Sequence, residues 1–181
     1  MNKIKRCIIG ILSIILLVGF DQYTKYLAII KLKNKKPFVI IDGVLQFNYL
    51  ENRGAAWGIL NGKKVLFVIS TTIIVAFLIY FFVKLPTKRR YNPLKVMTVI
   101  LIAGAIGNLI DRIRLDYVVD FIYFNLINFP IFNIADCYVT ISLIALIIAY
   151  SFVYTDDDFD FVNVAVSPQL STELMLLAAP L

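Results

Sequence analysis

The sequence predicts an all-α membrane protein with four transmembrane helices and a small extracytoplasmic β-sheet or loop region. Of its 181 residues, 60% are hydrophobic and only 17% are charged, and the mean hydropathy is +0.83. The apolar residues occur in long blocks, which excludes a disordered chain, a collagen and a coiled coil. The same numbers exclude an ordinary soluble domain.

Four apolar blocks define the expected spans, which cover about residues 7–30, 65–83, 93–112 and 135–154. The first block is long enough to cross the bilayer only if it continues through Asp21, Gln22 and Lys25, which then lie at its outer end. The second has no charged residue, and the third follows Pro93, a good helix-starting residue. Because no small-x-small cleavage site follows the first block, we interpret it as an uncleaved span and not as a secretory signal.

Positive charges predict the orientation in the membrane. They flank the first span and crowd the link between the second and third, at Lys3, Lys5, Arg6, Lys84, Lys88, Arg89, Arg90 and Lys95. Cytoplasmic segments carry such an excess, so we expect both termini in the cytoplasm. Lysines in the loop 31–64 count against this orientation. The net charge of +6 indicates contact with anionic membrane lipids and not with nucleic acid, since no soluble basic face is expected.

The outer loop 31–64 has the pattern of a small sheet. Phe38–Ile41 and Val44–Tyr49 are β-prone and flank Asp42-Gly43, a hairpin-turn pair. The loop continues into Asn52–Trp57, where small residues allow close approach of the backbone and the indole suits the membrane interface. We expect residues 1–154 to form a single domain and residues 155–181 to be a dispensable or non-native acidic tail.

Histidine is absent, which excludes a Ser-His-Asp triad and any imidazole metal site. Cys7 and Cys137 have no CxxC spacing, so we expect buried thiols and neither a zinc site nor a disulfide. We therefore expect no metal and no cofactor.

Four aspartates in or beside the apolar blocks need an explanation, because a charge inside a membrane costs about 2.5–3.5 kcal/mol. Asp21 stands at i,i+4 to Lys25, and Asp111 is adjacent to Arg112, so structural ion pairs explain both. The other two, Asp120 and Asp136, have no such partner in the sequence.

As residue types alone, Asp120 and Asp136 fit a catalytic dyad, a polar structural network or an ion path. In a dyad one carboxylate activates a water and the other, kept protonated, donates to the departing amine. A small transporter is the alternative function, although the block 65–83 offers it no polar path. A structural membrane protein is another alternative, which leaves the two aspartates unexplained.

Four stretches, taken together and in this order, resemble lipoprotein signal peptidase, also called signal peptidase II. They are Asp21–Lys25, Asn52–Trp57, Gly107–Arg112 with Val118–Phe121, and Phe132–Asp136. The resemblance extends from the first span through Tyr154. It implies an aspartic endopeptidase of the bacterial cytoplasmic (inner) membrane that needs neither metal nor nucleotide. Such an enzyme removes the signal peptide from diacylglyceryl-modified prolipoproteins by cleaving before the lipidated cysteine.

The resemblance also implies residue roles. Asp120 and Asp136 match the catalytic pair. Residues expected to bind or orient the substrate are Asn52, Gly54, Ala55, Asn108, Arg112 and Asn133, and those expected to be structural or orienting are Asp21, Lys25 and Asp111. Trp57 is a candidate lid residue. We expect a monomer whose active site faces the extracytoplasmic side and whose partners are the lipid-modified prolipoprotein and membrane lipids.

Overall fold

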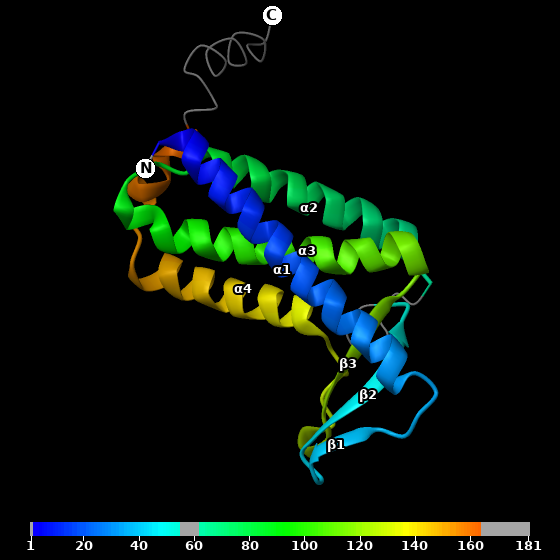
Figure 1. Ribbon diagram of the computed structural model, residues 1–181. Coiled ribbons are helices and arrows are strands. Elements are labelled where there is room, and N and C mark those ends of the chain that lie inside the picture. Colours follow the sequence, from blue (N-terminus) through cyan, green and yellow to red (C-terminus); the bar gives the residue numbers. More distant parts are fainter. Residues whose placement is uncertain (1, 55–61, 164–181) are drawn as a thin grey trace, which may run out of the picture.

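The computed structural model describes residues 2–54 and 62–163. Within these ranges four long helices form a bundle, and a three-stranded sheet extends from one end of it (Figure 1). The helices are α1 (Lys3–Leu32), α2 (Lys64–Lys84), α3 (Asn92–Leu115) and α4 (Ile134–Phe152), and the strands are β1 (Phe38–Ile41), β2 (Leu45–Asn52) and β3 (Val118–Phe124). The first three helices each contain one expected apolar block, and α4 covers the fourth up to Phe152, two residues short of its expected end. Among the described residues, three helices are long and apolar enough to cross a membrane: Lys64–Lys84, Arg89–Leu115 and Ile134–Phe152.

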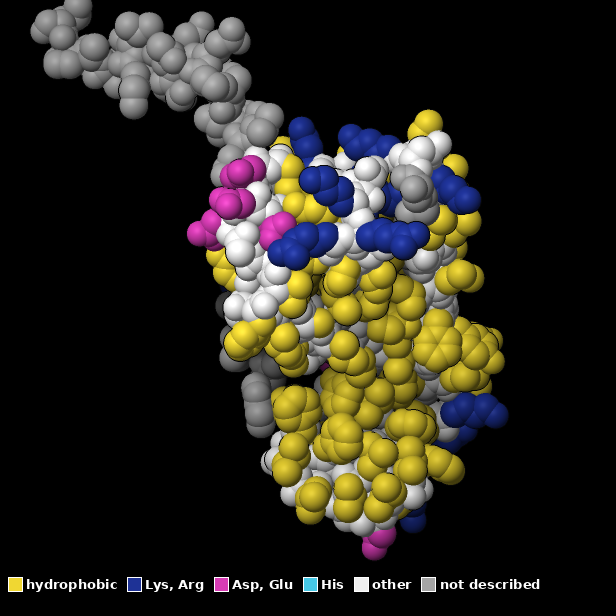
Figure 2. All heavy atoms as spheres, turned by 90° about the vertical axis from the view of Figure 1, so that its left-hand side faces the viewer, with side chains coloured by type: hydrophobic (Ala, Val, Ile, Leu, Met, Phe, Trp, Pro, Cys, Tyr) yellow, Lys and Arg dark blue, Asp and Glu magenta, His cyan; other side chains and the backbone are white. Residues whose placement is uncertain are grey.

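Helix α3 is the centre of the bundle. It packs against α1, α2 and α4, and its middle, from Leu101 to Gly104, is buried. Helix α2, in contrast, buries only Leu78 and Phe82. The outward faces of α1, α2 and α4 expose many Ile, Leu and Phe side chains, as expected of helices that contact lipid. Figure 2 shows such side chains over much of one face of the molecule.

Two glycines allow the close packing around α3. A Cβ atom on Gly104 would lie 2.6 Å from the carbonyl oxygen of Ala135, and one on Gly107 would lie 2.5 Å from Oδ2 of Asp21. Small residues let helix backbones approach each other in this way in membrane proteins. The start of α4 and the polar part of α1 therefore rest directly on α3.

We predict that Gly104→Ala lowers the free energy of unfolding by about 1–3 kcal/mol, because the new methyl group meets backbone that cannot move aside. Gly19→Ala is the matched control. Nothing lies within 4 Å of a Cβ at Gly19, so this change is expected to be neutral or stabilising. Thermal unfolding in detergent measures both, and a Gly104→Ala protein that melts no lower than the parent would contradict the packing argument.

The predicted hairpin is confirmed, because β1 and β2 are antiparallel and Gly43 lies in the turn between them with a φ of 68°. The third strand was not predicted. Strand β3 follows α3 closely and pairs antiparallel with β2, with Asp120 opposite Leu50. Val119 and Phe121 pack with Ala28 of α1. Because side chains alternate along a strand, Asp120 faces away from this cluster.

The segment after α4, the start of the acidic stretch 155–181, contacts the bundle. The guanidinium group of Arg90 donates to both carboxylate oxygens of Asp158, at 2.8 and 2.7 Å. These hydrogen bonds hold the pKa of Asp158 below its usual range. The hydroxyl of Tyr154 donates to the carbonyl oxygen of Arg90 at 2.7 Å. Residues 156–163 thus belong to the fold, and residues 164–181 lie outside the described ranges.

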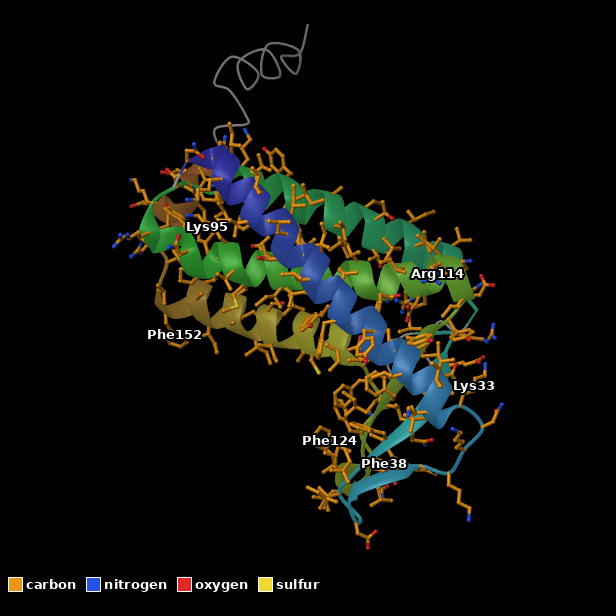
Figure 3. The ribbon with its side chains drawn as sticks, viewed as in Figure 1. Lys33, Phe38, Lys95, Arg114, Phe124 and Phe152 are labelled. Carbon is orange, nitrogen blue, oxygen red and sulfur yellow. The ribbon has the colours of Figure 1, made fainter. Side chains whose placement is uncertain are left out.

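The two ends of the bundle differ in chemistry. We call one the basic end, defined by Lys3, Lys5, Arg6, Lys84, Lys88, Arg89, Arg90 and Lys95; these side chains lie where α1 and α3 begin and α2 ends. The opposite end carries the sheet. In Figure 3, Lys95 marks the basic end, Arg114 lies at the opposite end of α3, and Phe38 and Phe124 lie on the sheet.

Candidate active site

The start of α4 is fixed by a capping box. The side chain of Asn133, the N-cap residue, accepts a hydrogen bond from the backbone N–H of Asp136 at 3.0 Å. In return, Oδ2 of Asp136 accepts from the backbone N–H of Asn133 at 3.0 Å. This reciprocal pattern follows directly from the local sequence, with Asn at the N-cap and Asp three residues later. The carboxylate of Asp136 is therefore held at the positive end of the helix dipole.

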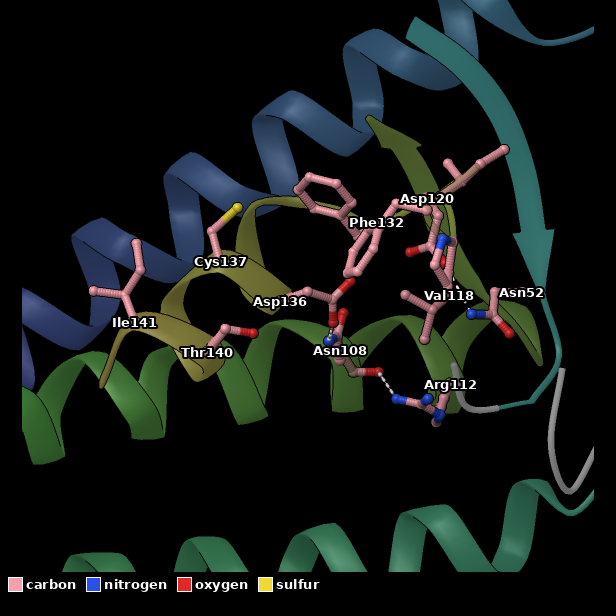
Figure 4. A pocket seen from close by; sticks show the side chains of 13 residues that line it. Asn52, Asn108, Arg112, Val118, Asp120, Phe132, Asp136, Cys137, Thr140 and Ile141 are labelled. Carbon is pink, nitrogen blue, oxygen red and sulfur yellow. Dashed lines mark hydrogen bonds between the residues drawn. The ribbon is translucent and has the colours of Figure 1, made fainter. Parts of the chain in front are cut away.

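Asp120 reaches the same place from β3. Its side chain is buried, and Oδ1 accepts from Nδ2 of Asn133 at 2.6 Å. Oδ2 accepts from Nδ2 of Asn52, at the end of β2, at 2.9 Å. The oxygen of Asn52 is itself occupied by the backbone N–H of Gly54, at 2.9 Å. Asn133 thus bonds Asp120 through its side chain and Asp136 through its backbone. Figure 4 shows the two aspartates together with Asn52 and Asn108.

Asn108 of α3 forms a second link to the pair. Its Nδ2 donates to Oδ1 of Asp136 at 2.7 Å. Its Oδ1 accepts from Nζ of Lys25 at 2.9 Å and from Nδ2 of Asn133 at 3.1 Å. Because two donors face the amide oxygen, the amide nitrogen must face Asp136. The orientation of Asn108 is therefore set by Lys25 and Asn133.

Lys25 is the centre of a buried ion cluster. Its Nζ lies 3.0 Å from Oδ2 of Asp21 and 3.1 Å from Oδ2 of Asp111, and all three side chains are buried. Asp21 also accepts from the backbone N–H of Ala135 at 2.9 Å, and Asp111 from that of Val119 at 3.1 Å. The cluster thus joins α1 and α3 to the segments that carry the two candidate catalytic aspartates.

The expected pairing of Asp111 with Arg112 is wrong, because Asp111 pairs with Lys25. Neighbouring residues on a helix point in different directions, so their side chains do not face each other. Arg112 turns instead toward the carbonyl oxygen of Gly54, 3.2 Å from its Nη2, and its guanidinium carbon lies 4.8 Å from the centre of the Phe67 ring.

Two site residues were missed by sequence analysis. Gln22 donates to Oδ1 of Asp111 at 2.9 Å and to the carbonyl oxygen of Gly107 at 3.2 Å, so it belongs to the ion cluster. The sequence does offer a signal for this role, because Gln22 is a polar residue next to Asp21 within an apolar block. Thr140 lies one helical turn after Asp136, and its side chain lines the cavity that contains both aspartates, described below. The i,i+4 spacing from Asp136 was sufficient to find it.

A cavity of about 460 Å³ contains both aspartates. Its walls combine a polar side with an apolar side, and its lining residues are Asn52, Asn108, Arg112, Val118, Asp120, Phe129, Pro130, Ile131, Phe132, Asp136, Cys137, Thr140 and Ile141. Such a cavity can hold an extended peptide segment against two carboxyl groups and a guanidinium group. Ala55 and Trp57 lie outside the described residues, so their expected roles stay predictions. Within the described residues, no group of three or more His, Cys, Asp or Glu side chains is placed to hold a metal ion.

The environment of Asp120 favours its protonated form. Burial raises the pKa of Asp120 to about 7, and the nearby charge of Asp136 acts in the same direction. Hydrogen bonds from Asn52 and Asn133 oppose this shift. Near neutral pH, Asp120 is therefore able to exchange a proton, as an acid or base in catalysis must.

This raised pKa predicts a pH dependence of stability. Between about pH 4 and pH 7 the folded protein binds more protons at Asp120 than the unfolded chain does, so the free energy of unfolding falls as pH rises. Asp120→Asn removes this contribution. Melting temperatures of both proteins across this range test it: the parent is expected to lose stability relative to the variant as pH rises. A constant difference, or one that grows in favour of the parent, would contradict the assignment.

Comparisons with known proteins agree with this architecture. The family model of signal peptidase (SPase) II matches residues 13–152. The chain is 40% identical over 140 residues to the lipoprotein signal peptidase of Streptococcus pyogenes serotype M5 (strain Manfredo), covering 76% of this chain and 90% of that relative. It is 39% identical to the corresponding protein of the serotype M3 strain ATCC BAA-595 / MGAS315, with the same coverage.

Solved structures show the same similarity. One, described as a bacterial membrane enzyme at 2.3 Å resolution, is 45% identical, with a TM-score of 0.69 over 77% of this chain and 85% of that one. Another with the same description, at 1.9 Å resolution, is 44% identical, with a TM-score of 0.69 over 81% of this chain and 94% of that one. The extent of these matches, which include every stretch that carries the two aspartates and their partners, shows that this chain is a membrane protease belonging to the signal peptidase II family.

Proposed function

We propose that this protein removes the signal peptide from diacylglyceryl-modified bacterial prolipoproteins, cleaving before the lipidated cysteine with a water activated by Asp120 and Asp136. One observation carries the proposal. Two carboxyl groups from different elements, β3 and α4, line the same cavity and share Asn133 as a hydrogen-bonding partner. The names of the relatives support the substrate class.

In the proposed mechanism the pair shares one proton. The ionised carboxyl group takes a proton from water, and the water oxygen attacks the carbonyl carbon of the scissile bond. The protonated carboxyl group then donates to the amide nitrogen as the C–N bond breaks. The products are a carboxylic acid, which loses its proton to solvent, and the free amine of the lipidated cysteine. The pair again holds one proton, since one carboxyl group has gained a proton and the other has lost one.

The hydrogen bonds around the pair support this mechanism. Asn52, Asn108 and Asn133 all present amide N–H groups to carboxylate oxygens, which fixes both carboxyl groups without supplying a competing acid or base. Arg112 lines the cavity beside the pair and is available to a carbonyl oxygen of the substrate. The roles of these four residues in orienting substrate and dyad are part of the proposal.

The geometry also supports a position for the site in the membrane. Helix α1 has 30 residues, about 45 Å, and we propose that it is the fourth span. Arg6 at the basic end and Lys25 in the ion cluster lie 19 positions apart on this helix, about 28 Å, which is close to the thickness of the hydrocarbon core. With the basic end and both termini in the cytoplasm, the cavity lies at the extracytoplasmic surface of the cytoplasmic membrane.

The test is a cleavage assay on one precursor in two forms, with and without the diacylglyceryl group. We expect cleavage of the modified form alone. The mass of the mature product should be that of a chain whose first residue is the lipidated cysteine. Equal cleavage of both forms, or a cut at another bond, would contradict the proposed specificity. No cleavage by a folded protein would contradict the proposed substrate itself.

A further inference from the structure

A second cavity lies at the basic end, away from the two aspartates. It has a volume of about 530 Å³ and is formed between α1 and α3, with Phe82 of α2 in its wall. Most of its surface is apolar, formed on one side by Ile9 and Leu16 of α1 and on the other by Val96 and Val99 of α3. Its polar residues are Arg6, Ser13, Asn92 and Lys95. From Arg6 to Leu16 it follows α1 for about 15 Å, so it is a groove that runs along the helix.

Two cations are buried in the wall of this groove. Arg6 is 2% exposed and Lys95 is 7% exposed. Among the described residues neither forms an ion pair, and the acceptors that they do contact are all neutral oxygens. Buried charges in proteins are normally paired, because an unpaired charge loses its hydration without compensation.

The surroundings compensate these cations only in part. Nη1 and Nη2 of Arg6 donate to the carbonyl oxygens of Leu85 and Val83, at the negative end of the α2 dipole. Its Nε is buried and has no acceptor among the described residues. Lys95 lies in the first turn of α3, where the helix dipole is unfavourable to a cation. Its ammonium group donates to Lys88 and Asn92, which leaves a third N–H available.

We propose that this groove binds an anionic phospholipid, with its phosphate beside Lys95 and Arg6 and one acyl chain along the apolar wall between α1 and α3. The phosphate supplies the negative charge that the buried cations lack, and the positive end of α3 adds to its attraction. The apolar length of the groove suits an acyl chain and not a free ion. This lipid site lies at the opposite end of the bundle from the two aspartates and does not depend on the proposed cleavage reaction.

The experiment measures lipid binding to the purified full-length protein in detergent, by native mass spectrometry and by melting temperature. The probes are dioleoylphosphatidylglycerol, dioleoylphosphatidylcholine and inorganic phosphate. We expect the anionic lipid to bind at least about tenfold more tightly than the zwitterionic one, and to raise the melting temperature. Inorganic phosphate at the same concentration should leave the melting temperature unchanged. Equal binding of the two lipids, or equal stabilisation by inorganic phosphate, would overturn the proposal.

Variants locate the site. Lys95→Gln keeps most of the side-chain volume and removes the charge, so it should weaken binding of the anionic lipid about tenfold. Lys88→Gln is the matched control, because the Lys88 side chain is an exposed cation at the same end but does not line the groove. If both variants bind the anionic lipid as the parent does, the groove is not the binding site.

A second pair of variants tests the acyl-chain part of the groove without changing any charge, and it decides the matter if Lys95→Gln fails to fold. Ser13→Phe places a ring inside the groove and should abolish the preference for the anionic lipid. Ile11→Phe, on an exposed face of the same helix, should leave that preference intact. A Ser13→Phe protein that binds dioleoylphosphatidylglycerol as tightly as the parent would overturn the proposal.

Discussion

Replacing Asp136 by Asn is expected to lower the rate of prolipoprotein cleavage by about a hundred- to ten-thousand-fold, the range typical of a lost general acid or base. The amide has the shape of the carboxylate but cannot exchange a proton at neutral pH. Both oxygens of Asp136 accept hydrogen bonds, one from Nδ2 of Asn108 and one from the backbone of Asn133. Asn108 cannot rotate to accommodate the change, since its oxygen already faces Lys25.

One amide donor therefore meets another in the variant, which costs about 1–3 kcal/mol of stability. This cost is smaller than the total stability of a typical folded protein, about 5–15 kcal/mol, so a folded but inactive protein is the expected outcome. Asp120→Asn should behave in the same way, because Asn52 and Asn133 both donate to that carboxylate. Melting temperature in detergent establishes folding before rates are compared.

Asp116→Asn is the matched control for both changes. Asp116 is an exposed carboxylate at the end of α3, outside the cavity, and its φ of 69° is a conformation that Asn adopts readily. The Asp116→Asn protein should cleave the prolipoprotein at the same rate as the parent. Near-parental cleavage by a folded Asp136→Asn or Asp120→Asn protein would show that the carboxyl group concerned takes no part in proton transfer.

Lys25→Met is expected to lower the free energy of unfolding by about 3–5 kcal/mol, the usual cost of removing one partner from a buried ion pair. The change leaves Asp21 and Asp111 buried without their cation. It also removes one of the two donors to the oxygen of Asn108, so that only Asn133 then holds the amide toward Asp136. We therefore expect cleavage to fall as well, even at a temperature where the variant is folded.

Lys33→Met provides the comparison for the loss of a lysine in an ion pair. Lys33 and Glu51 lie 2.9 Å apart, but both side chains are partly exposed to solvent. Such surface pairs contribute about 0–1 kcal/mol. Unfolding of both variants in detergent measures the difference, and equal losses for Lys25→Met and Lys33→Met would mean that the buried cluster does not hold the site together.

Local patterns in the sequence were sufficient for much of the fold. The charge-free block 65–83 lies within α2, and the Asp42-Gly43 pair lies in the turn between β1 and β2. Strand β3 was missed because its seven residues form a nearly continuous apolar run, which does not distinguish a buried strand from part of a helix. Its pairing with β2 joins residues about seventy positions apart, and no local signal encodes that contact.

The site shows the same limit. The motif residues Asn52, Asp120 and Asp136 come together in one cavity, as their joint occurrence in the sequence suggested. The partner of Asp111 was misjudged because Arg112 is its neighbour in sequence, whereas Lys25 reaches it from another helix. The contact of Asp158 with Arg90 was missed for the same reason. Contacts between distant segments depend on how the helices pack, which periodicity does not reveal.

The most direct test of a water activated by the two aspartates is a single turnover in H₂¹⁸O on a diacylglyceryl-modified precursor. The account predicts that the first signal peptide released carries one ¹⁸O atom in its new carboxylate, because the attacking oxygen comes from solvent. If a carboxylate of the enzyme attacked instead, and water then cleaved the resulting mixed anhydride at the carbonyl carbon of the aspartate, the first product would carry no ¹⁸O, because its second oxygen would come from Asp120 or Asp136. An unlabelled carboxylate in the first turnover would therefore contradict the account.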